Sequence, residues 1–283
     1  MAVIAEEELD IIRPLPTEHD FAIAAVIAAM RRDPTQALTL HEQADIAGYS
    51  PFHFARLFRD VIGIPPGEFL TALRFERSKE LLLTTDASVT EICFDIGYES
   101  LGTFSSRFRQ LIGVSPQQFR RFPHILTPDI FHERYSRVKL TMPTGAVSGR
   151  IALVEPGPTM SVYVGIFSAA IARGFPVAGL FVPAHGDFRI DDIPPGTYSV
   201  LAAAVPADAG PMTHLAPDRS LRVGVGSRRI VITAAGEESW VDISLRRHSP
   251  SDPPILISLP ALVLPPQELR LREEALGLDL RSG

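Results

Sequence analysis

The chain has 283 residues, enough for two domains that each bury an apolar core. Its hydrophobic content of 46% and charged content of 21% are those of a globular protein and exclude a disordered or collagen-like chain. The formal net charge of −6 gives no global sign of a nucleic-acid partner, although a DNA-binding surface needs only local positive charge.

Cysteine content and hydropathy restrict the compartment. Cys93 is the only cysteine, which excludes an internal disulfide, disfavours a cysteine-based zinc site and suits a reducing cytoplasm. The acidic start at 6–8 does not resemble a signal peptide. The apolar run at 21–30 is about half the length needed to span a bilayer, and the run at 255–264 is short and broken by Pro260. We therefore expect a cytoplasmic protein without a membrane segment.

An internal repeat is the most informative feature of the first half. Residues 46–69 read IAGYSPFHFARLFRDVIGIPPGEF, and residues 95–119 read DIGYESLGTFSSRFRQLIGVSPQQF. Gly48-Tyr49 matches Gly97-Tyr98 at an offset of 49, and after one extra residue the offset becomes 50. Further identities then follow in order: Phe54, Phe58, Arg59, Ile62, Gly63, Pro66 and Phe69 match Phe104, Phe108, Arg109, Ile112, Gly113, Pro116 and Phe119. So many coincidences indicate two copies of one structural unit.

Each copy predicts a helix, a sharp turn and a second helix. The first helices are expected at 40–47 and 89–96, and each ends at a glycine, which tolerates the left-handed backbone of a sharp turn. Ser50 and Ser100 stand where the N-cap of the second helix belongs, and Pro51 suits a first helical turn.

The second helix of each copy is expected to be half-buried. Its apolar residues recur at i, i+4 and i+8, and a glycine ends it: Phe54, Phe58, Ile62 and Gly63 in the first copy, then Phe104, Phe108, Ile112 and Gly113 in the second. One face is therefore buried and the opposite face is free. This is the plan of a helix-turn-helix unit.

A helix predicted from Pro66 to about Leu83 connects the two units. Such a helix would act as a strut. If it holds the two second helices about one DNA turn apart, roughly 34 Å, they would read neighbouring major grooves.

A longer pattern of motifs runs through both copies and the helix between them. The motifs are Gly48-Tyr49-Ser50, Phe54-x-Arg56-x-Phe58-Arg59, Gly63-x-x-Pro66-x-x-Phe69, Arg74 and Leu81-Leu82, then Ile92, Gly97-Tyr98, Phe104, Phe108, Gly113-x-Ser115-Pro116 and Phe119-Arg120. Over about 100 residues this pattern resembles the AraC/XylS family of bacterial transcription regulators. The resemblance implies an all-α, seven-helix, double helix-turn-helix DNA-binding domain, which we place at 19–122.

The resemblance also implies which residues meet DNA. Carried over by position, the base-facing residues are Phe52, Ala55 and Arg56 in the first recognition helix, and Leu101, Gly102, Thr103 and Ser106 in the second. Phosphate contacts, which give affinity without sequence information, are expected from Ser50, Arg59, Ser100, Arg107 and Arg109. Arg56 is the first candidate for reading a base, because its guanidinium suits guanine O6 and N7.

Several of these positions depart from the polar residues that the family often carries there. The departures are Phe52, Ala55, Leu101 and Gly102. Specificity is therefore expected to rest on few residues or on DNA shape, with the second unit reading sequence more weakly than the first. In the alternative interpretation, the helix-turn-helix units never touch DNA, and Arg56 and Arg59 are solvated surface charges.

Prolines and β-branched residues become frequent after Pro123. We expect a linker at 123–139, an antiparallel β-sandwich at 140–248 and a Pro-rich tail at 249–283. Strands are predicted at 147–154, 161–167, 177–182, 199–205, 221–225, 229–233 and 240–245. The fold class is thus multidomain, α followed by β.

The segment from Gly186 to Tyr198 reads GDFRIDDIPPGTY, with a Pro-Pro-Gly turn and core residues at Phe188, Ile190 and Ile193. It resembles the carboxypeptidase-regulatory-like, transthyretin-like β-sandwich domains. That resemblance implies a domain that binds, braces or mediates contacts and has no catalytic residues of its own.

Motifs for catalysis, metals or cofactors are incomplete. His41-Glu42-x-x-Asp45 lacks the second histidine of the HExxH zinc motif, and Gly224-x-Gly226 lacks the third glycine of a dinucleotide loop. We find no nucleophile–base set, so we expect no enzyme, no metal and no cofactor.

The expected partner is double-stranded DNA. A small-molecule effector, a contact with RNA polymerase and a homodimer are left open. The apolar run at 255–264 either completes the core of its own domain or forms a dimer contact. The rival function is a non-catalytic binding module, in which the sandwich holds a protein or carbohydrate and DNA contact only localises it.

Overall fold

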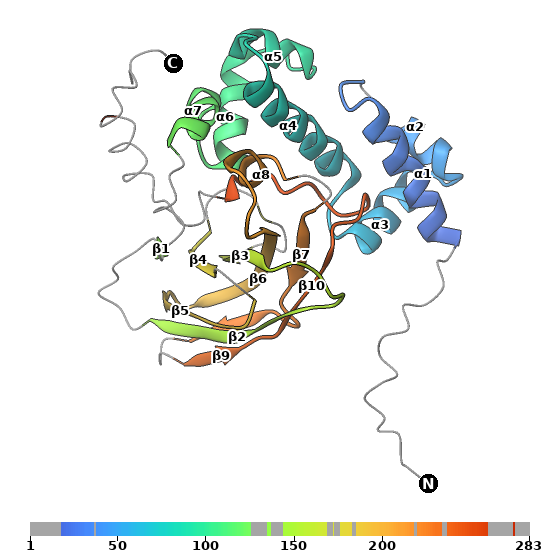
Figure 1. The fold of residues 1–283 in the computed structure, drawn as a ribbon. Coiled ribbons are helices and arrows are strands. Elements are labelled where there is room, and N and C mark those ends of the chain that lie inside the picture. The colour runs from blue at the N-terminus through green and yellow to red at the C-terminus, as the bar shows by residue number, and fades with distance from the viewer. Residues whose placement is uncertain are drawn as a thin grey trace. The chain divides into compact units, whose positions relative to one another are not determined.

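The computed structural model (Figure 1) describes residues 18–36, 38–125, 135–136, 144–168, 172, 176–182, 185–217, 220–233, 237–259 and 274. The chain divides into two compact units, Met1–Leu70 and Thr71–Gly283. The expected order of a helical region followed by a strand-rich region is confirmed. The predicted linker at 123–139 and the tail beyond Leu259 fall mostly outside the described residues.

The first unit contains helices α1 (Glu18–Arg32), α2 (Leu40–Ala47), α3 (Pro51–Ile62) and the start of α4 (Pro66–Thr84). Thr39 and Glu42 form a capping box that starts α2. Its core consists of apolar side chains that repeat at helical spacing: Ile23, Val26, Ile27, Met30, Ala44, Phe54, Phe58, Ile64, Phe69 and Leu70.

The second unit contains the rest of α4, then α5 (Val89–Asp95), α6 (Leu101–Ile112) and α7 (Pro116–Ile125). Ser88 and Glu91 form the capping box of α5. Aromatic rings hold these helices together: Phe75 stacks on Phe104 with ring centroids 5.8 Å apart. The helix predicted at 66–83 is confirmed as α4, of 19 residues, whereas its role as a strut stays a prediction.

Ten strands and one short helix follow within the described part of the second unit. The strands are β1 (Tyr135–Ser136), β2 (Gly145–Leu153), β3 (Met160–Phe167), β4 (Ala178–Val182), β5 (Asp187–Ile193), β6 (Gly196–Pro206), β7 (Arg222–Val225), β8 (Ile230–Ile232), β9 (Glu238–Trp240) and β10 (Ile243–Arg247). Helix α8 (Pro211–Leu215) lies between β6 and β7 in sequence. The predicted Pro-Pro-Gly turn joins β5 to β6.

The expected two-sheet antiparallel sandwich is not confirmed. The strands pair in one sheet in the order β1-β4-β3-β6-β7-β10-β2-β5, with β8 beside β6 and β9 beside β2. Strand β5 at one end of this order also contacts β4 near the other end, so the sheet is nearly barrel-like. Most pairs are antiparallel, but β2 runs parallel to both β10 and β9.

The interior of the barrel-like sheet is a continuous apolar core. It includes the three predicted core residues of the β5 segment, Phe188, Ile190 and Ile193, all of which are buried. Strands β3 and β6 are buried on both faces, which explains why they read as apolar runs rather than alternating patterns.

The outer face of β3 and β6 belongs to a second core that also contains the helices α4–α7. Tyr163, Leu201 and Ala203 from this face cluster with Phe108 and Ile112 of the second helix-turn-helix unit. The segment 255–259 joins the same cluster through three buried side chains: Leu256, Ile257 and Leu259. In its described part, the apolar run predicted at 255–264 therefore completes a core of its own chain.

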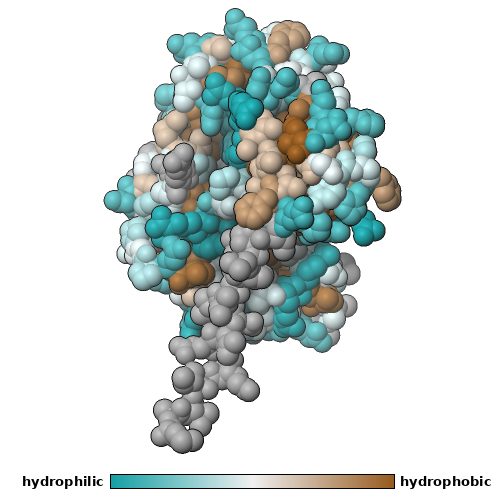
Figure 2. Space-filling view, turned by 90° about the vertical axis from the view of Figure 1, so that its right-hand side faces the viewer, coloured by the Kyte–Doolittle hydropathy of each residue, from teal (hydrophilic) through white to brown (hydrophobic). Residues whose placement is uncertain are grey.

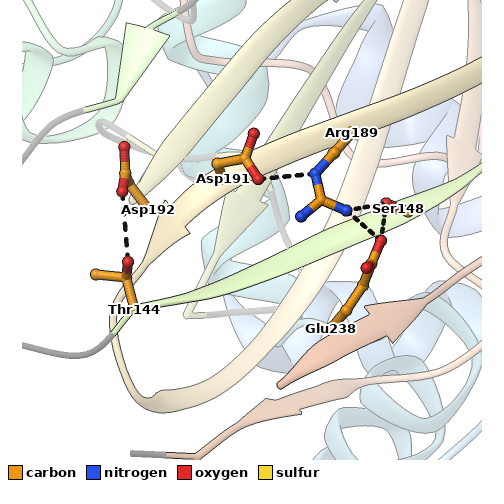
Figure 3. A network of polar contacts seen from close by, with 6 residues as sticks. All are labelled: Thr144, Ser148, Arg189, Asp191, Asp192 and Glu238. Carbon is orange, nitrogen blue, oxygen red and sulfur yellow. Dashed lines mark hydrogen bonds and ion pairs between the residues drawn. The ribbon is translucent and has the colours of Figure 1, made fainter. Parts of the chain in front are cut away.

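A polar network ties β2, β5 and β9 together on the surface (Figure 3). The Arg189 Nε donates to Asp191 Oδ1 at 2.8 Å, while its Nη1 contacts Glu238, which also accepts a hydrogen bond from Ser148. These charged side chains are about half exposed, so each ion pair adds little stability.

Candidate nucleic-acid interface

The first helix-turn-helix unit consists of α2, a glycine turn and α3. Gly48 adopts the left-handed conformation with φ of 73°, so the chain can leave α2 and enter α3 within three residues. Ser50 is the N-cap of α3, as predicted, but its side chain makes no capping hydrogen bond. Gly63 ends α3 with φ of 87°.

Helix α3 has one buried face and one exposed face. Phe54 and Phe58 are fully buried and contact each other edge to face. The predicted base-facing residues lie away from them: Phe52 is 83% exposed, the Arg56 side chain is 73% exposed, and Ala55 is half-buried. Large exposed aromatic rings are uncommon on protein surfaces, so Phe52 is a candidate contact residue.

The second helix-turn-helix unit repeats the arrangement with α5, a turn and α6. Gly97 has φ of 80° and Gly113 has φ of 99°, which matches the two left-handed turns of the first unit. Ser100 is the N-cap of α6, and its hydroxyl accepts a hydrogen bond from the Thr103 backbone N–H at 3.4 Å. That bond commits the hydroxyl of Ser100 to the helix end, whereas the hydroxyl of Ser50 makes no such bond.

The predicted base-facing residues of α6 also lie opposite the buried side chains. Leu101 is 41% exposed, and Gly102, Thr103 and Ser106 are exposed. Among the predicted phosphate contacts, Arg59, Arg109, Ser50 and Ser100 are exposed, whereas Arg107 is half-buried. The side chain of Arg107 donates to Gln110 Oε1 at 2.7 Å.

The exposed faces of α3 and α6 are basic. Helix α3 carries Arg56 and Arg59 against one carboxylate, Asp60, which lies 4.0 Å from Arg56. Helix α6 carries Arg107 and Arg109 and no acidic residue. Local positive charge is therefore present although the whole chain is acidic.

A helix-turn-helix family model described as "Helix-turn-helix domain" matches residues 43–121. The HTH-type transcriptional activator AarP of Providencia stuartii is 30% identical over 98 residues, which cover 35% of this chain and 73% of AarP. The RCS-specific HTH-type transcriptional activator RclR of Escherichia coli K12 is 34% identical over 106 residues, 38% of this chain and 37% of RclR. A putative AraC-like transcription regulator of Streptomyces lividans is matched over 34% of its length.

The chain belongs to the AraC family of helix-turn-helix transcription regulators. The predicted family resemblance of the helical part is thereby confirmed. The resemblance of the strand-rich part to carboxypeptidase-regulatory-like and transthyretin-like domains is not confirmed and stays a prediction. In longer relatives such as RclR, the matched segment is little more than a third of the protein.

A solved structure with a similar segment is the DNA-binding domain of AdpA, a global transcription factor, in complex with a target DNA. It is 29% identical, covers 35% of this chain and 89% of that chain, and has a TM-score of 0.34.

No helix in the described part of this AraC-family chain is long and apolar enough to cross a membrane.

Two polar residues of the helical region, Arg120 and Glu42, have structural roles. Arg120 reaches back to α4 and donates from Nε to the Leu82 carbonyl at 3.3 Å and from Nη2 to the Ala87 carbonyl. Glu42, part of the incomplete zinc motif, accepts hydrogen bonds from the Thr39 hydroxyl and backbone N–H, which hold the pKa of its carboxyl below the usual value.

Sequence reasoning missed two features near the interface. His53 is exposed on α3 next to Phe52, and its ring lies 5.0 Å from that of Tyr49. Lys79 of α4 is buried, and its Nζ donates to the Ile255 carbonyl at 3.1 Å. The position of His53 follows from helical period and could have been predicted, but the partner of Lys79 is 176 residues away and leaves no local signal.

Proposed function

We propose that the protein is a sequence-specific DNA-binding transcription regulator and not an enzyme. Its DNA-binding domain spans 19–122, and its two helix-turn-helix units read adjacent major grooves of one duplex. The observation that carries this proposal is the repeated pattern of α3 and α6, in which two phenylalanines anchor the helix and arginines stand on its exposed part.

We assign the reading of bases to two sets of residues. Phe52, Ala55 and Arg56 of α3 would contact base edges, as would Leu101, Gly102, Thr103 and Ser106 of α6. Arg56 reads a guanine, because its side chain is free enough to reach it and its guanidinium can donate two parallel hydrogen bonds. The apolar members contact thymine methyl groups or follow the shape of the groove.

The remaining residues of the interface bind phosphates. Arg59 and Arg109 end the exposed faces of α3 and α6, and the serine N-caps lie at the helix starts, where backbone N–H groups favour anions. Arg107 joins this group only if it leaves Gln110.

The test is retarded migration of a DNA fragment selected from the host's genome. Arg56→Ala with Arg59→Ala should abolish the shift at physiological salt, and where binding persists at low salt the slope of log K against log salt should be smaller by about 2. Arg150→Ala with Arg247→Ala removes the same charge from exposed strand positions and should leave the shift intact. Equal loss in both double variants would contradict the proposal, because the effect would then be one of net charge.

The strand-rich domain, predicted at 140–248, is proposed to sense a small molecule or to mediate association. Deleting residues 140–283 cannot test this role cleanly, since Leu256, Ile257 and Leu259 share a core with Ile112 of α6. Truncation would expose that core. Point changes in the strand-rich domain are the sharper test. A homodimer and a contact with RNA polymerase stay predictions.

A further inference from the structure

An apolar cavity lies on the outer face of the sheet, beneath the segment 252–259. Its volume is about 130 Å³. The sheet side includes Tyr163, Phe167, Leu201 and Val223, and the opposite side includes Ile255 and Leu259. A small apolar ligand that enters this space would remove its own apolar surface and that of the lining from water, which favours binding.

The lining favours a neutral ligand. Arg246 and Asp252, the charged lining residues, form a bidentate ion pair with distances of 2.7 and 2.6 Å. The Tyr163 hydroxyl is hydrogen-bonded to His214 Nδ1 at 2.8 Å, so its ring is left as an apolar wall. A cavity of roughly 150 Å³ with such a lining accepts a benzene-sized molecule, and this one is comparable.

The segment above the cavity is also attached to the second helix-turn-helix unit. The Lys79 Nζ of α4 donates to the Ile255 carbonyl at 3.1 Å, and the Ser258 backbone N–H approaches the Ile112 carbonyl, at the end of α6, to 3.5 Å. Ser258 is fully buried, and no described group is in hydrogen-bonding reach of its hydroxyl. The Ser258 hydroxyl is therefore a buried polar group that this position of the segment leaves unsatisfied, at a cost in free energy.

We propose that this cavity binds a neutral, single-ring apolar molecule and that the bound molecule moves the segment 252–259 against α4 and α6. The ligand would thereby alter DNA affinity through the second unit. This inference rests on the proposed function, because it identifies the effector class and the effector site of the regulator. The coupling is physical: one short segment lines the cavity through Ile255, Ile257 and Leu259 and contacts the end of α6 through Ser258.

Binding is tested with toluene as the probe and the full chain as the protein. At about ten times its Kd, toluene should raise the Tm by roughly 3 °C. Ala203→Phe fills the cavity and should remove this rise, whereas Ala152→Phe, at an exposed strand position, should keep it. Ala203→Ile fills less of the cavity and should also remove the toluene-induced rise in Tm, so it serves as the second variant if Ala203→Phe does not fold. The absence of a rise in the wild type, or an equal rise in a folded Ala203 variant, would overturn the site.

Coupling is tested by repeating the DNA retardation with and without toluene. The expected result is an affinity change of at least five-fold in the wild type and none in Ala203→Ile. Toluene binding without any effect on DNA affinity would overturn the coupling. If toluene raises the Tm of the wild type but the wild type binds no DNA with or without toluene, the proposed function is contradicted and the binding site is not. The two failures are therefore distinguishable.

Discussion

The two helix-turn-helix units share one sequence pattern but differ at the end of the recognition helix. Ile62 and Ile112 occupy the same repeat position, yet Ile62 is half-buried and Ile112 is fully buried. Likewise, Val61 is 43% exposed, whereas its counterpart Leu111 is 4% exposed. The difference arises because the segment 255–259 packs into the core of the second unit.

This comparison shows that a repeat fixes the fold of its units but not their surroundings. The first unit keeps a simple helical core and a freely exposed Arg56. The second helix-turn-helix unit shares its core with the sheet. The side chain of its Arg107 is half-buried and donates a hydrogen bond to Gln110. We therefore expect the first helix-turn-helix unit to dominate base reading and the second to carry the influence of the strand-rich domain.

On the face drawn in Figure 2, apolar surface forms separate patches among hydrophilic side chains.

The largest expected effect is a difference in stability between matched core changes. Ile112→Ala should lower the free energy of unfolding by about 2–5 kcal/mol, because it leaves a cavity where three elements meet. Ile62→Ala should cost roughly half as much, since the side chain is already partly hydrated. Urea denaturation followed by circular dichroism measures both. Equal costs would break the comparison.

The next effect concerns base reading. Arg56→Ala should relax discrimination at one base pair by about 1–3 kcal/mol in a selected site. Arg107→Ala should weaken binding to all sequences by a similar factor and leave the base preference unchanged. Competition binding with single-base variants of the site measures both. If Arg107→Ala or Thr103→Ala shifts base preference more than Arg56→Ala, the roles of the units are reversed.

A smaller effect is a rise of stability with pH, which comes from the buried Lys79 of α4. Burial lowers the pKa of Lys79 from 10.5 to about 8, opposed by the nearby carboxylates of Glu76 and Glu80. Because the unfolded chain holds this proton up to about pH 10.5 and the folded chain loses it near pH 8, stability rises as pH rises through this window. The gain should be roughly 1–2 kcal/mol between pH 8 and 9.5.

Lys79→Met provides the control for that pH effect, since it keeps the alkyl chain and removes the titrating group. The rise in stability should vanish in this variant. Lys79 is one of two lysines in the chain, so ¹⁵N-lysine NMR can follow its titration directly. A Lys79 signal that titrates near 10.5 in the folded chain would contradict the burial of its ammonium group.

The smallest effect lies within the first unit and compares two helix starts. Thr39→Ala removes the capping box of α2 and should cost roughly 1 kcal/mol. Ser50→Ala should change stability little, because the Ser50 side chain makes no capping bond to α3. Thermal unfolding measures both. The same Ser50→Ala variant should still weaken DNA binding if Ser50 contacts a phosphate.

The helices and their caps could be predicted because their signals are local. Gly48 and Gly63 take left-handed backbone conformations, and the phenylalanine spacing fixes which face of α3 is buried. The sheet could not be predicted to the same depth. The parallel pairing of β2 with β10 and β9 joins segments almost a hundred residues apart, and the strand pattern alone favoured an antiparallel sandwich.

The candidate site shows the same division. Helical period predicted the exposure of Phe52, Arg56 and Thr103, which need only their own helix. The contact of Lys79 with Ile255 depends on a partner 176 residues away, which no local pattern specifies. Long-range packing, not propensity, decided this contact.

The central claim is that both recognition helices of one chain read the same duplex. Hydroxyl-radical and methylation-interference footprints on a selected fragment test it most directly. We expect two protected tracts about one helical turn apart, roughly 10–10.5 base pairs, with guanine methylation interference in the tract whose protection Arg56→Ala erases. A single tract that neither Arg56→Ala nor Arg109→Ala alters would contradict it.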